Sequence, residues 1–263
     1  MLTRSTLKLI RSLDTRKGRR REGLFVAEGP KLVGELLGHF VLRQLFVADD
    51  VVGAQASLLH GVSPSCLSVV SSDELSRASL QQTPQGVLAL FKIPRDEADF
   101  ASVASSSLTL ALDDVQDPGN LGTIVRLADW FGVSDIWCTP ATADIWSPKA
   151  IQATMGGIAR VRVHIINNLS LALASLPAAV PVYGTSLHGE ALWHTELAPT
   201  GVIVLGNEGR GVCTEVEAQC RCRLLIPNYP AGRPTTESLN VATATGIVLA
   251  EFRRRCYSPS PIH

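Results

Sequence analysis

The stretch PGNLGTIVRLADWFG, residues 118–132, places Asn120 and Gly122 where a strand should pass into a helix. A dinucleotide-binding loop at such a junction carries three spaced glycines, which let the backbone approach a pyrophosphate. Here the third glycine is absent, and Arg126 lies within the stretch instead. The pattern is therefore typical of a phosphate-binding loop adapted to another use, and the guanidinium of Arg126 is its unusual group.

Two further stretches combine glycines, amides and charged residues in the same way. They are VLGNEGRGV, residues 204–212, and LIPNYPAGRPTTESLNVA, residues 225–242. Loops at the carboxyl ends of parallel strands converge on one edge of a sheet, where α/β proteins bind ligands. Each stretch alone is also ordinary turn chemistry, since Asn-Gly and Pro-Gly pairs favour turns. The three together predict a single site.

The three stretches lie at the ends of apolar runs of strand length, and the first, extended to DDVQDPGNLGTIVR (113–126), adjoins the run 108–114. In the second part of the chain these runs are 108–114, 135–138, 162–165, 181–185, 201–206 and 222–227, with helix-like segments between them. Such runs predict an α/β domain with a mainly parallel sheet covered on both faces. The longest predicted helix is 238–255, with Ser238 as its N-cap and arginines 253–255 near its C-terminal dipole.

The first part of the chain predicts a smaller α/β domain of roughly 90 residues. Its expected strands are 23–29, 43–49, 66–70 and 86–91, and its expected helices are 30–37, 54–60 and 72–79. Residues 94–107 carry acids and small residues without helical or strand periodicity. We therefore assign 1–94 to the first domain, 95–107 to a linker and 108–263 to the second domain.

The three stretches resemble the motifs of the SpoU group of the SPOUT superfamily, whose members are RNA ribose 2'-O-methyltransferases. The first motif, Asn-x-Gly followed by an arginine, matches Asn120, Gly122 and Arg126. The second matches Leu205, Gly206, Asn207, Glu208 and Gly211, and the third matches Ile226, Pro227, Glu237, Ser238, Leu239, Asn240 and Val241. Residues 20–37 are similar to the start of the L30e-like substrate-binding domain that many of these enzymes carry.

This resemblance implies a deep trefoil knot in the second domain and S-adenosylmethionine as the cofactor. The family holds the cofactor mainly with backbone groups of the loops that end the late strands. Here those positions are Thr185, Leu205, Gly206, Asn207, Gly211, Ile226, Ser238 and Leu239. One departure is plain, because nine residues, NYPAGRPTT (228–236), separate Pro227 from Glu237 where the usual motif has a shorter link. That loop would border the cofactor site.

The implied reaction moves a methyl group from a sulfonium to a ribose 2'-hydroxyl. Family precedent gives Arg126 the role of accepting the proton that the hydroxyl loses. A guanidinium is a poor base, because its pKa lies above ~12. Two interpretations stay open: a transiently neutral Arg126 takes the proton, or a charged Arg126 clamps the adjacent phosphate while another group or water accepts it. The residues expected to orient Arg126 and the RNA are Asn120, Glu208 and Asn240. Ser238 offers a hydroxyl near the methyl group or the phosphate.

The charges of the chain balance, with 24 Lys+Arg against 24 Asp+Glu, which argues against a globally basic nucleic-acid binder. Between Arg4 and Arg21, however, eight basic residues accompany one acid, Asp14. Such a block is either a solvated terminus or a contact surface for nucleic acid. The residues expected to contact RNA phosphates are Arg16, Lys17, Arg19, Arg20 and Arg21.

Cysteine, histidine and hydropathy patterns limit the remaining possibilities. The six cysteines lack the paired spacing of a zinc site and the six histidines have no metal-ligand pattern, so no metal is expected. Reduced thiols indicate a cytoplasmic protein. Neither a signal peptide nor a run of about 20 apolar residues is present, and we expect no membrane partner.

The resemblance further implies a homodimer, in which the helix of the first motif and the final helix contribute to the contact. The apolar stripe of the first of these helices consists of Ile124, Leu127, Ala128 and Phe131, flanked by Trp130. A stripe of this kind is also typical of an ordinary core-facing helix.

Several functions stay open at this point. The leading hypothesis is methylation of structured RNA, and the extra N-terminal domain favours ribosomal RNA over transfer RNA. A non-catalytic RNA-binding or ribosome-assembly factor with the same fold is disfavoured, because the charged and amide motif residues are all present. A nucleotide-dependent oxidoreductase is disfavoured, because no G-x-G-x-x-G follows the first strand of either half.

Overall fold

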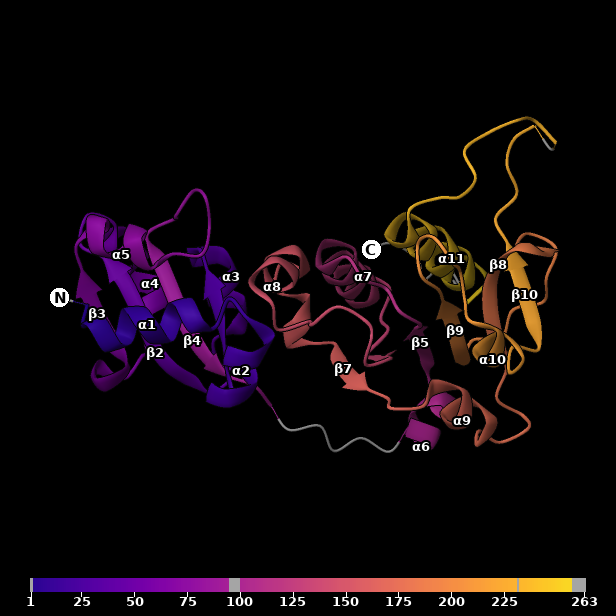
Figure 1. The fold of residues 1–263 in the computed structure, drawn as a ribbon, viewed down its shortest axis with the longest axis horizontal. Coiled ribbons are helices and arrows are strands. Elements are labelled where there is room, and N and C mark those ends of the chain that lie inside the picture. Colours follow the sequence, from indigo (N-terminus) through magenta and orange to yellow (C-terminus); the bar gives the residue numbers. More distant parts are fainter. Residues whose placement is uncertain (1, 95–99, 231, 257–263) are drawn as a thin grey trace, which may run out of the picture. The chain divides into compact units, whose positions relative to one another are not determined.

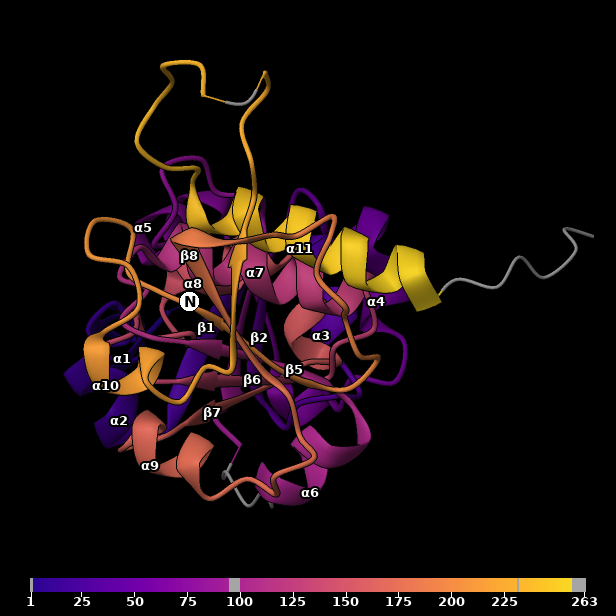
Figure 2. The same ribbon diagram turned by 90° about the vertical axis from the view of Figure 1, so that its right-hand side faces the viewer.

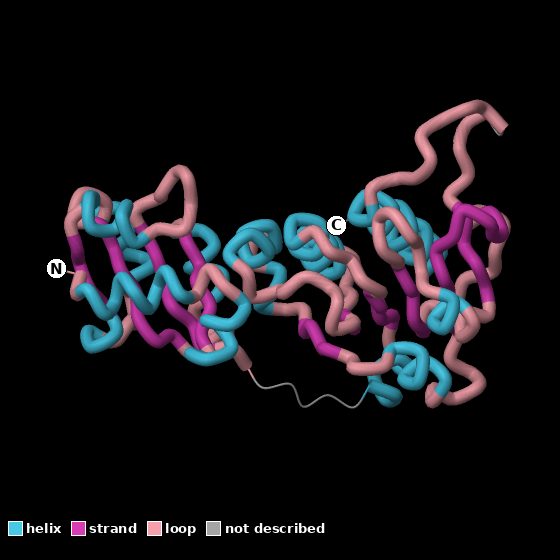
Figure 3. The backbone as a smooth tube through the Cα atoms, in the orientation of Figure 1, coloured by secondary structure: helices cyan, strands magenta, loops and turns pink. Residues whose placement is uncertain are grey.

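The computed structural model describes residues 2–94, 100–230 and 232–256 (Figure 1). The chain forms two compact units. The first comprises Met1–Arg95 with Asp144–Ala159, and the second comprises Asp96–Ala143 with Arg160–His263. Each unit contains one β-sheet with helices packed around it (Figure 3).

The sheet of the first unit has the strand order β1-β4-β2-β3. Its strands are Leu24–Glu28 (β1), Leu42–Ala48 (β2), Leu67–Val70 (β3) and Val87–Lys92 (β4). β4 is antiparallel to β1 and β2, whereas β2 and β3 are parallel. The helical elements are Arg4–Ser12 (α1), Arg16–Glu22 (α2), Pro30–Leu36 (α3), Val52–Gln55 (η1), Ala56–Leu59 (α4), Pro64–Cys66 (η2) and Ser72–Ala78 (α5). Every strand and helix expected in this region is present.

One face of this sheet is covered by α1 and α5. Ile10 of α1 and Leu75 of α5 are buried in one cluster with alternate strand residues such as Val26 and Phe46. The local sequence sets the start of α5, where Ser71 and its capping-box partner satisfy each other's backbone N–H groups. Alternation along the strands thus sends one set of apolar side chains to this face.

The opposite face of the sheet carries an aromatic cluster. The ring centroid of Phe25 lies 5.6 Å from that of Phe91, 5.3 Å from that of Phe40 and 4.9 Å from that of Trp146. Trp146 is distant in sequence from the other three, so the cluster depends on a segment that returns to this unit.

That segment is 144–159, which the sequence patterns placed in the second domain and which lies in the first unit. It contains Pro148–Thr154 (α8) and the 3-10 turn Gly157–Ala159 (η3). Asp144 Oδ2 accepts hydrogen bonds of 2.9 and 2.6 Å from Nε and Nη2 of Arg19. The segment therefore contributes both apolar and charged contacts to the first unit.

The segment expected as a linker, 95–107, is only partly covered by the structure, because 95–99 lie outside the described residues. Its later part forms the helix Phe100–Ser106 (α6). Ala104 is fully buried in the core of the second unit. The small residues that hide the helical period in the sequence also let this helix pack closely.

The second unit confirms the predicted parallel α/β sheet. Its order is β10-β8-β9-β5-β6-β7, and every pairing is parallel. The strands are Leu108–Leu112 (β5), Asp135–Cys138 (β6), Arg162–Ile165 (β7), Val182–Ala191 (β8), Gly201–Leu205 (β9) and Cys222–Leu225 (β10). The remaining helices are Pro118–Trp130 (α7), Leu169–Ala174 (α9), Thr214–Glu217 (α10) and Val241–Cys256 (α11). Among the described residues, none of the helices is long and apolar enough to cross a bilayer.

Helices α7 and α11 lie side by side in this unit (Figure 2). Their C-terminal ends are joined by Arg253, whose Nε donates to Phe131 O at 2.6 Å and whose Nη2 donates to Gly132 O at 2.9 Å. In the middle, a Cβ added at Gly246 would lie 3.5 Å from Leu127 Cδ2, so the small residue brings the two helices close.

The start of α11 differs from the prediction. The helix begins at Val241, and Asn240 Oδ1 accepts hydrogen bonds from the backbone N–H groups of Ala242 at 3.0 Å and Thr243 at 3.2 Å. Asn240 is therefore the N-cap. The prediction of Ser238 as the cap was wrong, because both residue types cap helices and only the backbone geometry distinguishes them.

Candidate active site

The loops of the first and second motifs start side by side, because β5 and β9 are parallel neighbours that end together. Asp113 N donates to Leu205 O at 2.9 Å, and Asp113 Oδ2 accepts from Cys213 N at 2.8 Å. Asn207 Nδ2 donates to Asp114 O, also at 2.9 Å. Backbone and side-chain bonds thus hold the two loops in a fixed relation.

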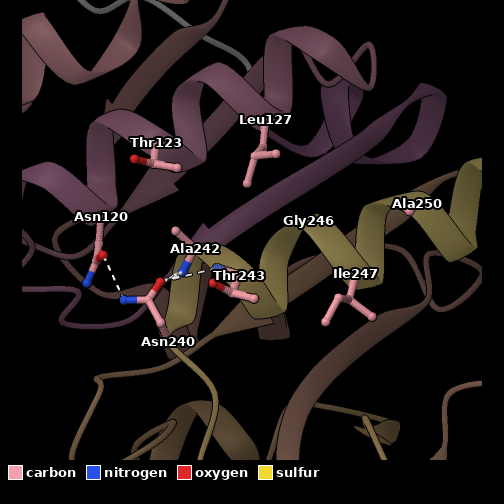
Figure 4. Close-up of a pocket in the computed structure, with 9 residues that line it drawn as sticks. All are labelled: Asn120, Thr123, Leu127, Asn240, Ala242, Thr243, Gly246, Ile247 and Ala250. Atoms are coloured by element: carbon pink, nitrogen blue, oxygen red, sulfur yellow. Dashed lines mark hydrogen bonds between the residues drawn. The ribbon is translucent and has the colours of Figure 1, made fainter.

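Side chains from all three motifs then form one hydrogen-bonded chain, which we call the amide chain (Asn240, Asn120 and Glu208). Asn240 Nδ2 donates to Asn120 Oδ1 at 3.0 Å, as Figure 4 shows. Asn120 Nδ2 donates in turn to Glu208 Oε1 at 2.9 Å. The structure therefore brings together residues that are 120 positions apart in the first pair and 88 positions apart in the second.

The direction of the amide chain follows from helix capping. Asn240 Oδ1 is already occupied by the first N–H groups of α11, so its Nδ2 must face Asn120. Asn120 consequently accepts with its oxygen and presents its NH₂ to Glu208. The NH₂ of Asn120 requires an acceptor, and Glu208 Oε1 is that acceptor. One cap thus sets the orientation of two amides and a carboxylate.

The second-motif loop is closed on itself. Asn207 and Gly211 exchange backbone hydrogen bonds of 3.0 and 2.9 Å, and Gly211 has a φ of +72°. A Cβ at Gly206 would lie 2.1 Å from the backbone carbon of Gly211. Both glycines are therefore required by the loop's own geometry, whatever the loop binds.

Arg126 does not join the amide chain. It follows Asn120 by six residues on α7, which places it about 9 Å further along the helix and about 240° around its axis. The side chain is exposed, and within the described part of the chain it has no hydrogen bond or ion pair. An exposed guanidinium of this kind suits contact with a group from another molecule.

The residues expected at the cofactor are brought together only in part. Leu205 ends β9 and Ile226 follows β10, whereas Thr185 lies within the neighbouring strand β8. The β8–β9 pairing stops at Gly184 and Val204, just before Thr185 and Leu205. These strand ends fit the backbone recognition that S-adenosylmethionine requires.

Ser238 and Leu239 do not lie against those strand ends in this structure. They belong to an exposed segment before α11, where Leu239 is 47% exposed. Asn207 and Gly211, in contrast, are in the closed second-motif loop. Of the cofactor residues in the third motif, Ser238 and Leu239 are thus exposed, whereas Ile226 directly follows β10.

At least three thiols in the described part of the chain are poorly suited to nucleophilic chemistry. Burial raises the pKa of the Cys138 and Cys220 thiols to about 12, and it is the main cause that raises the pKa of the Cys213 thiol. A thiol with a raised pKa is a poor nucleophile. The described residues contain no group of three or more His, Cys, Asp or Glu side chains that could hold a metal ion.

The N-terminal basic cluster requires one correction. Arg19 is 3% exposed and donates to Asp144 and to the carbonyls of Leu13 at 2.7 Å and Asp14 at 2.8 Å. It therefore stabilises the first unit and is not available to RNA phosphates. The other members differ, since Lys17, Arg20 and Arg21 are exposed and Arg16 is half-buried.

A groove of about 510 Å³ lies between α7 and α11 (Figure 4). Its lining residues are Asn120, Thr123, Leu127, Asn240, Ala242, Thr243, Gly246, Ile247 and Ala250. The predicted apolar stripe on α7 contributes little to it, because Ile124 and Ala128 are fully buried in the unit. Trp130, in contrast, is 83% exposed at the end of α7.

Two aspartates that support the site were not predicted from the sequence. Asp117 Oδ1 accepts from Asn120 N at 2.8 Å and so starts α7, and Asp114 forms an ion pair with Arg210 of the second-motif loop. The Asp-Pro pair at 117–118 was a readable signal for a helix start. The contacts of Asp114 with the second-motif loop had no sequence signal, because Asn207 and Arg210 lie more than 90 residues away.

Comparison with known proteins agrees with this site. Residues 107–250 match the SpoU rRNA Methylase family, and residues 4–89 match the MRM3-like substrate binding domain. The chain is 30% identical over 246 residues to the 23S rRNA (guanosine(2553)-2'-O)-methyltransferase RlmP of Bacillus subtilis, covering 92% of this chain and 94% of that protein.

Two solved structures are similar over nearly the whole chain. A putative RNA methyltransferase of the TrmH family from Porphyromonas gingivalis has a TM-score of 0.84 and 42% identity, covering 97% of this chain and 99% of that one. An AdoMet-bound rRNA methyltransferase from Sinorhizobium meliloti has a TM-score of 0.82 and 29% identity, covering 98% and 97%.

Proposed function

The chain belongs to the SpoU rRNA Methylase family, and from this premise we propose that it methylates a ribose 2'-hydroxyl of ribosomal RNA with S-adenosylmethionine as methyl donor. The comparisons identify the chain as an RNA methyltransferase, and the SPOUT fold of the family implies a knot in the second unit. The observation that carries the proposal is the amide chain, which joins one residue from each of the three motifs.

S-adenosylmethionine supplies a methyl group on a positively charged sulfur when it is bound. We propose that Leu205, Gly206 and Ile226 at the ends of β9 and β10 hold it together with Thr185, where β8 parts from β9, and that Asn207 and Gly211 shape the loop beside it. Ser238 and Leu239 would complete this set by moving toward the strand ends. The exposure of both residues supports a segment that is free to do so.

For Arg126 we favour the phosphate-clamp interpretation. The side chain lies in water without an acidic partner among the described residues, and a solvated guanidinium stays protonated. A positive charge beside the target phosphate would favour the alkoxide that forms when the 2'-hydroxyl loses its proton. The proton itself would then pass to water or to another group, while Glu208 and the two amides position the RNA.

We also propose a homodimer that uses the α7/α11 groove. Leu127 and Ile247 line the groove, and the ring of Trp130 is exposed beside it at the end of α7. Such a surface suits a second copy of the chain, whose own groove and tryptophan would meet it symmetrically. Light scattering at micromolar concentration should give about twice the 28.1 kDa mass of the chain, and a fully active monomer would contradict the proposal.

The first unit is proposed to bind the substrate RNA through Arg16, Lys17, Arg20 and Arg21. Three of these side chains are exposed on one short helix, α2. Replacing Lys17, Arg20 and Arg21 with alanine should weaken RNA binding and reduce the slope of log affinity against log salt by about 0.7 for each phosphate that is no longer neutralised. An unchanged slope in filter binding would mean that these residues are only solvated.

Transfer RNA is the second candidate substrate, since the motifs do not identify the RNA. The decisive experiment maps ribose methylation in ribosomal and transfer RNA from cells with and without the protein. We expect one or a few ribosomal 2'-O-methyl groups to disappear when the protein is absent. Loss of a methyl group only from transfer RNA would make transfer RNA the substrate in place of ribosomal RNA. No change in either RNA would favour a non-catalytic assembly factor.

We propose a cytoplasmic location, where ribosomal RNA is found. All six cysteines are free of disulfide bonds, which supports this location.

A further inference from the structure

The segment from Asn228 to Asn240 stands away from the sheet of its unit, between β10 and α11 (Figures 1 and 2). Every residue of this segment that the structure describes is exposed. Its two ends, in contrast, are anchored at the site. It starts just after the predicted cofactor residue Ile226 and ends at Asn240, which caps α11 and belongs to the amide chain.

Tyr229, at the start of this segment, is 93% exposed. Among the described residues it is the most exposed of the large apolar side chains, ahead even of Trp130. A ring held in water gains nothing for the fold, since hydrophobic stabilisation depends on area removed from water. The packing of this unit therefore does not explain why the segment carries an aromatic residue.

Two hydrogen bonds fold the segment back near Tyr229. Asn228 Nδ2 donates to Arg233 O at 2.7 Å, and Arg233 N donates to Pro230 O at 3.2 Å. Pro230 and Pro234 restrict the backbone on either side of this turn. An aromatic ring and a guanidinium are thus carried on one small, locally restrained tip.

The segment carries one arginine, Arg233, and one acid, Glu237, and no ion pair joins the two among the described residues. Two further arginines, Arg221 and Arg223, precede the segment. Arg221 donates to the carbonyl of Ala178, and Arg223 forms an ion pair of 3.2 Å with Glu217. Arg233 has no comparable bond from its guanidinium among the described residues, so it is the arginine that is available to an anion.

We propose that this tip reads a nucleotide next to the methylated ribose, with the ring of Tyr229 stacked on its base and the guanidinium of Arg233 on its phosphate. The inference rests on the proposed function and adds substrate recognition to it. A ribose that is open to methylation lies in an unpaired or irregular RNA segment, whose neighbouring bases present free faces. Aromatic stacking and a nearby cation are the usual means of binding such a base.

The experiment compares full-length Tyr229→Ala, Tyr229→Phe and Arg233→Ala with the unchanged protein. Thr235→Ala is the matched control, because it alters an exposed residue of the same segment without removing a ring or a charge. The substrate is ribosomal RNA from cells that lack this protein, and the readouts are KM for RNA, kcat, and the calorimetric Kd for S-adenosylmethionine.

Tyr229→Ala should raise KM for RNA by about 5- to 100-fold, the range expected for loss of one stacked base, with kcat changed less. Tyr229→Phe should restore most of the affinity, because the face of the ring is kept. Arg233→Ala should raise KM and reduce the salt dependence of binding by about one phosphate contact. The Kd for S-adenosylmethionine should stay within about twofold in every variant.

Three results would overturn the proposal. The first is a KM for Tyr229→Ala equal to that of Thr235→Ala, and the second is a Tyr229→Phe variant as impaired as Tyr229→Ala. The third is a loss of cofactor affinity that matches the loss of activity, which would make the segment a cover for S-adenosylmethionine instead. If the unchanged protein transfers no methyl group to any RNA, the proposed function fails, whereas an active protein indifferent to Tyr229 overturns only this inference.

Discussion

The sequence predicts functional roles for both Arg19 on α2 and Arg126 on α7, but the two side chains lie in opposite environments. Arg19 is buried, and its guanidinium is occupied by a carboxylate and two carbonyls. Arg126 is exposed and unpaired within the described residues. A buried guanidinium must be fully bonded and so becomes part of the fold, whereas a solvated one stays available to a ligand. Changes at the two positions should therefore have separable effects on stability and activity.

The largest effect is expected from Arg19→Ala. The change leaves Asp144 and the carbonyls of Leu13 and Asp14 without their donor, which should lower the free energy of unfolding of the first unit by about 3–5 kcal/mol. Urea denaturation of the full chain measures this. Arg20→Ala is the matched control and should cost less than about 0.5 kcal/mol, because Arg20 is exposed on the same helix. Equal stability of the two variants would mean that Arg19 has no special structural role.

Arg126→Ala should have the opposite profile. Methyl transfer should fall by about 10²- to 10³-fold, because a positive charge beside the developing alkoxide is removed. The free energy of unfolding and the affinity for S-adenosylmethionine should change little, since the side chain is exposed and has no hydrogen bond or ion pair among the described residues. Methyl transfer from labelled cofactor gives the rate and calorimetry gives the affinity. An equal loss of cofactor binding would contradict the assignment of Arg126 to the RNA.

The amide chain provides an intermediate case, tested by Asn240→Asp. Aspartate keeps the cap on α11 but has no NH₂ to donate to Asn120, so stability should hold while kcat falls by about tenfold. Asn240→Ala is the comparison, because it removes both the cap and the donor and should also cost about 1 kcal/mol of stability. If Asn240→Asp is as active as the unchanged protein, the order of donors and acceptors does not matter for the reaction.

A smaller effect on stability is expected at Glu251, which forms ion pairs with Arg254 and Arg255 of its own helix. Hydrogen bonds from Arg254, and then from Arg255, hold the pKa of Glu251 at about 2. A depressed pKa means that the stabilisation is complete above the pKa of an unfolded glutamate, near 4.3, and is lost as pH falls through about 2. Arg254 is 69% exposed, so solvent screening reduces the contribution of Glu251 to about 1 kcal/mol.

The measurement is the stability of Glu251→Gln relative to the unchanged protein at several pH values. The difference should be full at pH 7 and should shrink as the pH is lowered from about 4.3 toward 2. A difference that does not depend on pH would mean that packing, and not charge, carries the role of Glu251.

Much of the second unit could be predicted from the sequence, because its signals are local. Apolar runs indicated the strands of the parallel sheet, and the amides and glycines after them marked the loops that meet at Asn120, Glu208 and Asn240. The N-cap of α11 could not be chosen, since Ser238 and Asn240 have similar capping propensity and only tertiary bonds select one of them.

The burial of Arg19 could not be predicted for a different reason. Its partner Asp144 is 125 residues away, and no period or composition in either stretch reports on the other. The same holds for the approach of Trp146 to Phe25. Charge runs describe what a segment is made of, whereas burial depends on which distant segment covers it.

The return of residues 144–159 to the first unit has a consequence for how the protein can be divided. The chain passes between the two units three times, near residues 95, 143 and 159. A fragment that ends at residue 94 would lack Asp144 and Trp146 and would leave Arg19 buried without its anion. The first unit therefore cannot be separated from the rest of the chain by a cut at residue 94, and a hybrid that exchanges this unit would have to carry 144–159 with it to be stable.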